Sequence, residues 1–266
     1  MRLLLCFYLL IFSFLTLNAQ SKIDRPFEVS WKKETSYFAT GGGMLLASNI
    51  LRQRTANFLE IELQALDAAN INQFDRKATT YYSPKIDKAS DYVWYSTHAL
   101  PLLFFTQKDL HQDAGTVAVM YSEVLFLNAG ATLLSKYTFR RARPFAYNDN
   151  APLEERLGNK AKTSLVSGHT SMSAANTFFV AQVFSTYYPE SKWKPAVWSA
   201  AIVVPAVTGY LRVRAGRHFP TDVLAGYALG ATIGVLVPKL HEQKKWQARG
   251  ISMTVGMNSA YLEWRF

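Results

Sequence analysis

The stretch GYLRVRAGRHFPTDVLAGYALG (209–230) places a histidine and an aspartate four residues apart, beside several arginines. At this spacing the carboxylate of Asp222 can accept a hydrogen bond from one imidazole nitrogen of His218 and leave the other nitrogen as a free lone pair. A histidine oriented in this way is a candidate nucleophile. The arginines, with Arg212 first among them, indicate that the group under attack is an anion.

A second cluster, KYTFRRARP (136–144), carries a lysine and an arginine seven residues apart. Seven residues are two helical turns, so Lys136 and Arg143 are expected to share one face of a helix and to reach one anion. Pro144 biases the residue before it away from the helical region, so we expect this helix to end at Arg143.

A third cluster, SGHTS (167–171), is predicted to open a helix. The first backbone N–H groups of a helix have no partner within it, and with the positive end of the helix dipole they favour an oxyanion. Gly168 permits a close backbone approach at this point. Ser167 and His169 add a hydroxyl and an imidazole on either side, so this cluster also suits a phosphate.

Each of these residues also has a simpler interpretation. Ser167 alone would be interpreted as a helix cap, and His169 alone as a hydrogen-bonded core histidine. Their grouping with Lys136, Arg143 and Arg212 favours the functional interpretation. Four other basic residues near helix ends are interpreted as side chains that reach the membrane surface or set topology: Arg140, Arg141, Arg214 and Arg217. Three histidines outside the clusters are assigned no role: His98, His111 and His241.

Apolar segments separated by polar stretches predict an all-α fold, a bundle of six helices. The segments lie near 36–51, 92–105, 115–136, 169–188, 196–212 and 222–239. Start signals precede the second segment at Ser90-Asp91 and the sixth at Thr221-Asp222. The clusters fall at the end of the third helix, the start of the fourth, and the junction of the fifth and sixth. Helices that alternate in direction place these ends on one face, so the three clusters are expected to converge.

Three other segments complete the expected organisation. Residues 58–71, FLEIELQALDAANI, carry apolar and acidic residues at helical spacings and predict an amphipathic surface helix. Residues 145–165 are polar and predict a loop. The tail ISMTVGMNSAYLEWRF (251–266) switches to a period of two around Asn258-Ser259 and predicts a short β-hairpin. Residues 20–250 as a whole are expected to form one helical domain.

The three clusters, taken in order, resemble the motifs of the type 2 phosphatidic acid phosphatase superfamily. That superfamily also includes bacterial acid phosphatases and vanadium-dependent haloperoxidases, and it carries K-x6-R-P, then P-S-G-H, then S-R-x5-H-x3-D. Val166 in place of proline and Leu211 in place of serine are the two departures, and neither removes a group that the chemistry needs. The matching residues span 136–222: Lys136-x6-Arg143-Pro144, Val166-Ser167-Gly168-His169 and Leu211-Arg212-x5-His218-x3-Asp222.

The resemblance implies the acid phosphatase type of helical bundle and a reaction without a metal or other cofactor. His218 would attack phosphorus to give a phosphohistidine, and Asp222 would hold its tautomer. His169 would protonate the departing alkoxide and later assist the attack of water. Five residues would hold the phosphoryl oxygens: Lys136, Arg143, Ser167, Gly168 and Arg212.

Residues 1–19, MRLLLCFYLLIFSFLTLNA, carry one arginine and an apolar core before Gln20, as in a secretory signal cleaved after Ala19. A retained membrane anchor is the alternative. Cleavage would change the formal net charge from +10 to +9 and would remove Cys6, the single cysteine of the chain. The mature chain would then hold no disulfide and no cysteine nucleophile, so it would rely on other chemistry.

Composition favours an anionic partner, which could be a nucleic acid, an acidic membrane surface or a phosphorylated substrate. The chain has 266 residues, is 49% hydrophobic and carries a formal charge of +10, which suits a phosphorylated partner. It shows no interleaved basic and aromatic motif for nucleic acid. The expected substrate is a phosphate ester or pyrophosphate, most simply of a lipid in the cell envelope. The alternatives are a haloperoxidase that holds vanadate and a non-catalytic lipid-binding protein, and the oligomeric state stays open.

The topology is the least determined feature. Several apolar segments are only about 14–17 residues long, near or below the length that spans a bilayer, and the mean hydropathy is −0.02. Six full spans after an exported start would place the clusters on the cytoplasmic face, whereas an exported phosphatase needs them on the opposite face. Because several segments are short, we expect a periplasm-facing site on a membrane-associated bundle whose helices do not all span the membrane.

Overall fold

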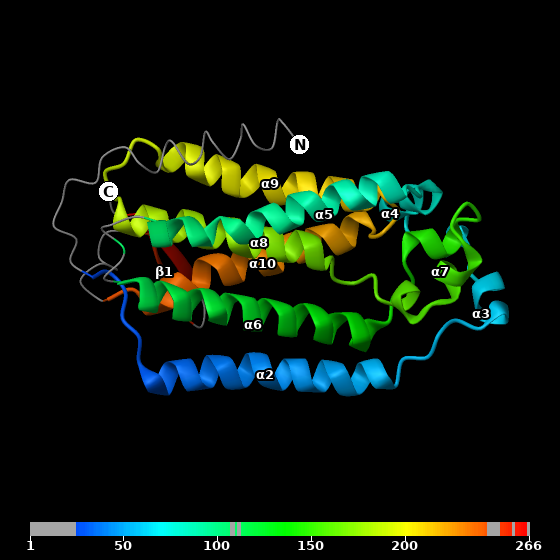
Figure 1. Cartoon of the computed structure of the whole chain (residues 1–266), viewed down its shortest axis with the longest axis horizontal. Coiled ribbons are helices and arrows are strands. Elements are labelled where there is room, and N and C mark those ends of the chain that lie inside the picture. The colour runs from blue at the N-terminus through cyan, green and yellow to red at the C-terminus, as the bar shows by residue number, and fades with distance from the viewer. Residues whose placement is uncertain (1–24, 107–109, 111–112, 244–250, 257–258, 265–266) are drawn as a thin grey trace.

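The computed structural model describes residues 25–106, 110, 113–243, 251–256 and 259–264 of the chain (Figure 1). The predicted signal segment 1–19, with Cys6, lies outside the described residues, and so does His111.

Helices of sixteen residues or more run along the long axis of the molecule (Figure 1). Among the described residues these are α2 (Trp31–Gln53), α5 (Pro84–Ala99), α6 (Ala114–Phe139), α8 (Gly168–Tyr187), α9 (Lys194–Arg214) and α10 (Pro220–His241). Five of the predicted apolar segments overlap helices, with bounds that differ by one to five residues. The segment 92–105 is displaced, because α5 begins at Pro84, where the Ser83 hydroxyl accepts a hydrogen bond from the N–H of Ile86 at 3.3 Å. Ser90 and Asp91, the predicted start, lie inside this helix.

Short helices occupy the connections, so the described residues hold more helices than the six predicted. The amphipathic helix expected over 58–71 is reduced to α3 (Glu60–Gln64) and the 3-10 turn η1 (Ala68–Asn70), because Asp67 caps a new turn by accepting from the N–H of Ala69 at 2.7 Å. The polar segment predicted as a loop contains η5 (Pro144–Tyr147), α7 (Leu153–Leu157) and η6 (Asn159–Lys162). The other short helices are α4 (Gln73–Arg76), η2 (Lys77–Thr80) and η3 (Pro101–Thr106).

Helix α8 lies at the centre of the bundle and touches α10 along its length. A Cβ atom added at Gly230 of α10 would lie 1.9 Å from the carbonyl oxygen of Ser171, so only glycine fits there. Four residues earlier, a Cβ at Gly226 would lie 2.5 Å from the carbonyl oxygen of Ser167. The contacts advance together along both helices, so α8 and α10 are parallel and their first turns lie side by side.

The ends that carry the three clusters lie at one end of the bundle, on the right in Figure 1. Helices α6 and α9 end there, and α8 and α10 begin there. The polar residues of three distant sequence segments are therefore brought together by the packing of four helices.

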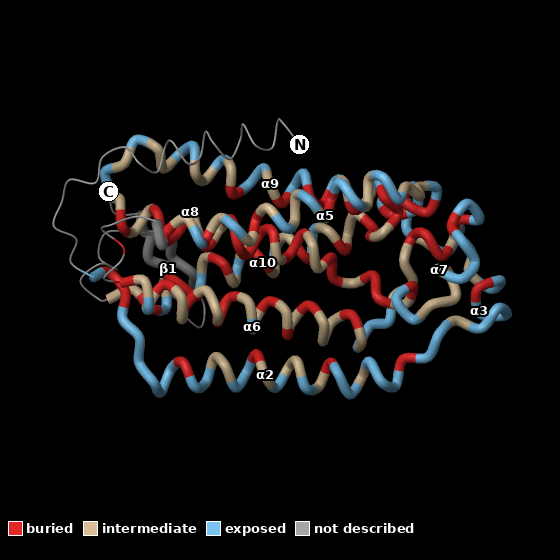
Figure 2. Tube along the Cα trace, in the orientation of Figure 1, coloured by how far each residue is buried: buried red, intermediate tan, exposed pale blue. Residues whose placement is uncertain are grey.

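Three of the described helical segments are long and apolar enough to cross a membrane: Ala114–Tyr147, Lys194–Arg214 and Pro220–His241. Of the segments expected to be too short to span, 196–212 lies in the longer helix Lys194–Arg214, so the expectation is wrong for this segment, because the helix continues past its apolar core. The 26 residues of α6 extend about 39 Å at 1.5 Å per residue. Large apolar residues of α9 such as Ile202 and Val203 are exposed and suit a lipid environment. Figure 2 shows exposed residues along this helix.

Two strands, β1 (Ile251–Gly256) and β2 (Ser259–Trp264), pair antiparallel in the tail. Ile251 lies opposite Trp264, and Gly256 lies opposite Ser259. The predicted hairpin falls on these residues, and its turn at 257–258 lies outside the described residues.

Candidate active site

His218 lies in the turn between α9 and α10, 1% exposed, and its ring is held by Ser164. The distance from Nδ1 of His218 to the carbonyl oxygen of Ser164 is 2.7 Å. A carbonyl only accepts hydrogen bonds, so Nδ1 carries the hydrogen and Nε2 presents a lone pair. The expected hydrogen bond to Asp222 is not formed, because Oδ2 of Asp222 lies 3.9 Å from Nδ1.

Asp222 acts on His218 through Ser164. Oδ2 of Asp222 accepts hydrogen bonds from the Ser164 hydroxyl at 2.5 Å and from the backbone N–H of Phe219 at 2.9 Å. The carboxylate is fully buried. Ser164 thus meets the imidazole with its carbonyl and the carboxylate with its hydroxyl, which explains why the predicted direct bond is replaced by an indirect one.

Arg141 joins Asp222 to a second buried carboxylate, that of Asp75. Its Nη1 lies 2.6 Å from Oδ1 of Asp222 and its Nη2 lies 2.8 Å from Oδ2 of Asp75. The guanidinium also packs on the ring of Phe219, 4.2 Å from the ring centroid. The interpretation of Arg141 as a side chain that reaches the membrane surface is therefore wrong. Arg140 keeps an exposed position and donates to the carbonyl of Tyr137.

Lys136 and Arg143 converge on Thr163, but they do not share a helix face. Helix α6 ends at Phe139, four residues earlier than expected, and Arg140 after it takes the left-handed conformation with φ of 46°. Arg143 therefore lies in extended backbone outside the helix. Nζ of Lys136 donates to the carbonyl of Thr163 at 3.1 Å, and Nη2 of Arg143 donates to its hydroxyl at 3.3 Å. Both cations therefore contact Thr163, Lys136 from helix α6 and Arg143 from the extended segment after it.

The first turn of α8 opens beside the buried Lys136. The backbone N–H of Ser167 donates to the carbonyl of Asp222 at 3.0 Å, and its hydroxyl lies 2.9 Å from that of Thr170. A Cβ atom added at Gly168 would lie 3.7 Å from Cε of Lys136. The N–H groups at a helix start and a neighbouring ammonium are the two features that an oxyanion site needs.

Arg212 and His169 both face carboxylates of α5. Nη1 of Arg212 donates to Asp87 at 2.5 Å and to the hydroxyl of Ser90 at 2.9 Å, and it lies 3.7 Å from Oδ1 of Asp91. Nε2 of His169 lies 2.9 Å from the same oxygen of Asp91. Helix α5 therefore holds one cation and one imidazole of the predicted site in place.

The interpretation of Arg217 as a side chain that reaches the membrane surface is wrong, because Arg217 lines a pocket beside Arg143 and Arg212. It pairs with Oδ2 of Asp87 at 2.6 Å and with Glu155 of α7, so it ties α5 to the connection that follows α6. Arg214, which was grouped with it, stacks on the ring of Tyr81 at 4.4 Å.

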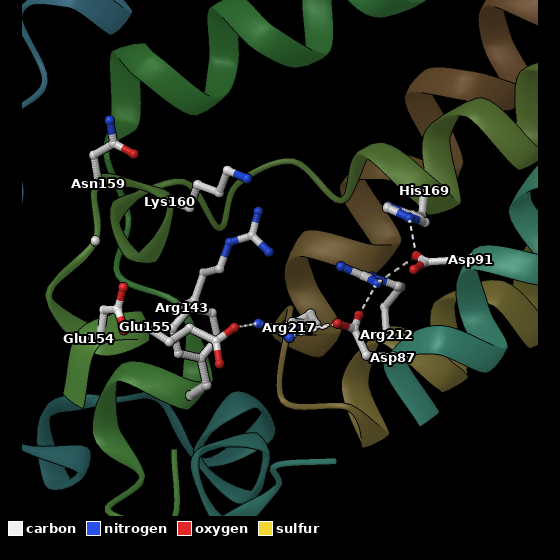
Figure 3. Close-up of a pocket in the computed structure, with 12 residues that line it drawn as sticks. Asp87, Asp91, Arg143, Glu154, Glu155, Asn159, Lys160, His169, Arg212 and Arg217 are labelled. Atoms are coloured by element: carbon white, nitrogen blue, oxygen red, sulfur yellow. Dashed lines mark hydrogen bonds and ion pairs between the residues drawn. The ribbon is translucent and has the colours of Figure 1, made fainter. Parts of the chain in front are cut away.

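A pocket of about 500 Å³ opens beside Arg143, His169, Arg212 and Arg217 (Figure 3). The predicted site residues Lys136, Ser167, Gly168 and His218 are not among the residues that line it. Figure 3 shows His169 and Arg212 on one side and Asn159 and Lys160 of η6 on the other, with the Arg143 guanidinium between them. The lining combines cations, acids and a few other groups: Asp87, Asp91, Arg143, Phe145, Glu154, Glu155, Gly158, Asn159, Lys160, His169, Arg212 and Arg217.

Both histidines of the site are held neutral. Burial, followed by the charges of Arg212, Arg143 and Lys136, lowers the pKa of His169 to about 2. Burial and the same cations hold the pKa of His218 well below its usual value. A bound phosphate would offset the cations that lower these pKa values, so an anion in the pocket favours protonation of His169.

The predicted site residues thus lie together, and the residues that prediction missed are those that orient them. Asp87, Ser90 and Asp91 are outside the three clusters, although their spacing of three and four residues places them on one face of α5. That spacing is the signal that could have found them. The carbonyl of Ser164 is a backbone group and has no signal in the sequence.

Comparison with known proteins finds a matching family model and relatives of similar sequence. The PAP2 superfamily model matches residues 117–246, the stretch that holds all three clusters. The chain is 29% identical over 146 residues to an undecaprenyl-diphosphatase of Sulfolobus acidocaldarius, covering 55% of this chain and 62% of that protein. It is 35% identical over 124 residues to a lipid A 1-phosphatase of Rhizobium johnstonii, covering 45% of each.

A solved structure is also similar, the crystal structure of a transmembrane PAP2 type phosphatidylglycerolphosphate phosphatase from Bacillus subtilis. It matches with a TM-score of 0.48 at 22% identity, over 76% of this chain and 96% of that one. The chain spans less than two thirds of the length of the two curated relatives. The candidate spans and the superfamily match support membrane association.

Proposed function

We propose, from the PAP2 superfamily domain that this chain carries, that the protein is a metal-independent phosphatase acting on a phosphomonoester or pyrophosphate of a lipid in the cell envelope. The observation that carries the proposal is His218, whose Nδ1 hydrogen is committed to Ser164, which leaves Nε2 as a lone pair within reach of the charges of Lys136, Arg143 and Arg212. The matched relatives, named as phosphatases of lipid phosphates, favour a lipid substrate.

In the first step, Nε2 of His218 forms a bond to phosphorus, and the bond from phosphorus to the ester oxygen breaks. His169 gives a proton to the departing oxygen, which leaves as an alcohol. The buried cations and the first N–H groups of α8 hold the phosphoryl oxygens and stabilise the charge of the transition state. The products of this step are a phosphohistidine and the free alcohol.

In the second step, water attacks the phosphohistidine. His169, now neutral, takes a proton from the water, and the bond from phosphorus to Nε2 breaks to release inorganic phosphate. The Ser164 carbonyl holds the Nδ1 hydrogen of His218 through both steps, so the nucleophile returns to its starting tautomer. The positive charge that metals supply elsewhere comes here from Lys136, Arg143 and Arg212.

We place the pocket on the periplasmic side of the membrane, with the mature chain beginning at Gln20. The apolar surface of α9 and the candidate spans support a protein embedded in lipid, with the pocket at one end of its helices. A phosphate headgroup near the membrane surface could enter the pocket while its acyl or prenyl chains remain in the bilayer.

The test is phosphate release by the purified chain from phosphatidate, phosphatidylglycerophosphate, undecaprenyl pyrophosphate, lipid A and a soluble ester. We expect release from at least one lipid, faster than from the soluble ester. No release from any of them would favour a non-catalytic lipid-binding protein. Bromination that depends on added vanadate, without phosphate release, would favour a haloperoxidase.

A further inference from the structure

The end of the bundle opposite the phosphate pocket holds another buried cluster, built from Glu34, Glu123 and His241. Glu34 lies in the first turn of α2, Glu123 in α6, and His241 is the last residue of α10. The three residues are 2%, 0% and 1% exposed. His241 is about 29 Å from Asp222 along the axis of α10 at 1.5 Å per residue. The cluster is therefore separate from the proposed phosphatase site.

The imidazole of His241 is oriented as a ligand. Its Nδ1 lies 2.8 Å from the carbonyl oxygen of Val237, which only accepts, so Nδ1 carries hydrogen and Nε2 faces the carboxylates. A backbone carbonyl on the second ring nitrogen is the usual support of a metal-binding histidine. Glu34 is also oriented, because its Oε1 accepts from the N–H of Ser30 at 2.7 Å.

The spacing of the ligand atoms fits one small ion. Nε2 of His241 lies 3.4 Å from Oε1 of Glu34 and 3.3 Å from Oε2 of Glu123. The three ligand atoms lie within 4.8 Å of one another. Two atoms bound to a tetrahedral ion at about 2.0–2.1 Å are about 3.3 Å apart. The two nitrogen-to-oxygen distances are thus those of neighbouring ligands around such an ion.

Four polar atoms of this cluster have no hydrogen-bond partner within the described part of the chain. Among the described residues, no hydrogen bond reaches Oε2 of Glu34, either carboxylate oxygen of Glu123, or Nε2 of His241. No lysine or arginine in the described part of the chain pairs with either carboxylate. Two carboxylates and a neutral imidazole balance one divalent cation, whereas a protonated imidazole alone leaves a buried negative charge.

We propose that Glu34, Glu123 and His241 form a structural site for a divalent transition-metal ion of the Zn²⁺ type, which joins α2 to α6 and α10. A set of one imidazole and two carboxylates suits zinc and its first-row neighbours better than calcium or magnesium, which prefer oxygen ligands alone. The site supplies stability to the bundle and takes no part in the phosphate chemistry.

The test uses the full chain, purified in detergent without an affinity tag, stripped with a chelator and dialysed. Zinc is then added. One portion is desalted, and its bound metal is counted by elemental analysis. A second portion keeps the free zinc, and its thermal unfolding curve is recorded. We expect one zinc ion per chain. With free zinc at 100-fold its dissociation constant, we expect the unfolding temperature to rise by roughly 5–10 °C.

The variant Glu123→Gln separates metal loss from a folding failure. It removes one of two facing carboxylates, so the metal-free variant is expected to unfold at the same or a higher temperature than the metal-free parent. We expect it to lose both the bound zinc and the zinc-dependent shift, and Glu34→Gln to do the same. The matched control is Glu242→Gln, which changes the next carboxylate along the chain, bonded to Gln182 and Thr186, and should keep both.

Three results would overturn the site. The stripped parent could take up no zinc and show no shift. The shift could be as large in Glu123→Gln as in the parent, which would place the metal elsewhere. The control Glu242→Gln could lose zinc as fully as Glu123→Gln, which would remove the assignment to these three residues.

Discussion

The Nδ1 atom of His218 lies 2.7 Å from the carbonyl oxygen of Ser164, and this contact determines which nitrogen is free. The hydroxyl of the same serine donates to the carboxylate of Asp222. A change at either group would leave the imidazole free to rotate or to exchange tautomers. The orientation of the proposed nucleophile thus depends on a backbone group that a side-chain substitution cannot remove.

Replacing His218 by alanine should reduce phosphate release by at least about 1,000-fold, because the cations can hold phosphate but only the imidazole can bond to it. The parent should form a phosphoenzyme that is labile to acid and stable to base, and the variant should form none. Circular dichroism and thermal unfolding check that the variant is folded. Turnover within tenfold of the parent would show that His218 is not the nucleophile.

The residues that contact phosphate in this proposal could be predicted because their types and spacings are local. Lys136, Arg143, His169 and Arg212 each stand in a short motif, and the alternation of helices brings the motifs to one end of the bundle. The end of α6 could not be predicted as well. Pro144 signals a stop, but the helix already ends at Phe139, where Arg140 takes a left-handed conformation that its residue type does not announce.

The groups that orient the site could not be predicted because they come from contacts between distant segments. Arg141 is separated by more than sixty residues from both Asp75 and Asp222, which it joins. From its sequence context alone it looks the same as Arg140. Only the packing distinguishes the buried pair from the exposed neighbour.

This difference between Arg141 and Arg140 can be measured as a difference in the free energy of unfolding of two alanine variants. Arg141→Ala leaves two buried carboxylates without their cation, so we expect it to lower the free energy of unfolding by about 3–5 kcal/mol. Arg140→Ala removes an exposed side chain and should change it by less than about 0.5 kcal/mol. Chemical denaturation in detergent measures both. Equal small losses would mean that the Arg141 pairs contribute no stability.

Acid should destabilise the fold below about pH 6.5. The pKa of His169 is lowered to about 2 and that of His218 lies well below its usual value, so the unfolded chain binds protons that the folded chain does not. Stability is therefore present above the unfolded pKa of about 6.5 and is lost as the pH falls, by about 1.4 kcal/mol per unit for each histidine. Unfolding is measured at pH 7.5, 6.0 and 5.0.

The control for this pH dependence is the double variant His169→Gln and His218→Gln, which removes both groups. Its stability should fall less steeply between pH 6.5 and pH 5.0 than that of the parent. Parallel curves for the two proteins would mean that other groups cause the loss.

Chelators should leave phosphate release unchanged at 25 °C, because cationic side chains supply the charge at the phosphate site. The same treatment should lower the unfolding temperature if the cluster of Glu34, Glu123 and His241 holds a metal. The two readouts separate the two sites. Activity that is lost with EDTA while the chain stays folded, and that returns with magnesium or zinc, would contradict the metal-independent reaction.

Replacing His169 by alanine should harm poor leaving groups most. A general acid matters in proportion to the basicity of the departing oxygen, so an alkyl phosphate should lose roughly 100-fold or more while a nitrophenyl phosphate loses far less. Asp91, whose Oδ1 lies 2.9 Å from Nε2 of His169, holds the ring in the free site. Burial and the charge of Asp87 raise the pKa of Asp91, and its ionised carboxylate, 3.7 Å from Nη1 of Arg212, would repel a bound phosphate. Asp91→Asn should therefore keep the preference for leaving groups and shift mainly the affinity for phosphate, measured by product inhibition. Equal losses of His169→Ala on both esters would show that His169 positions the substrate and does not transfer the proton.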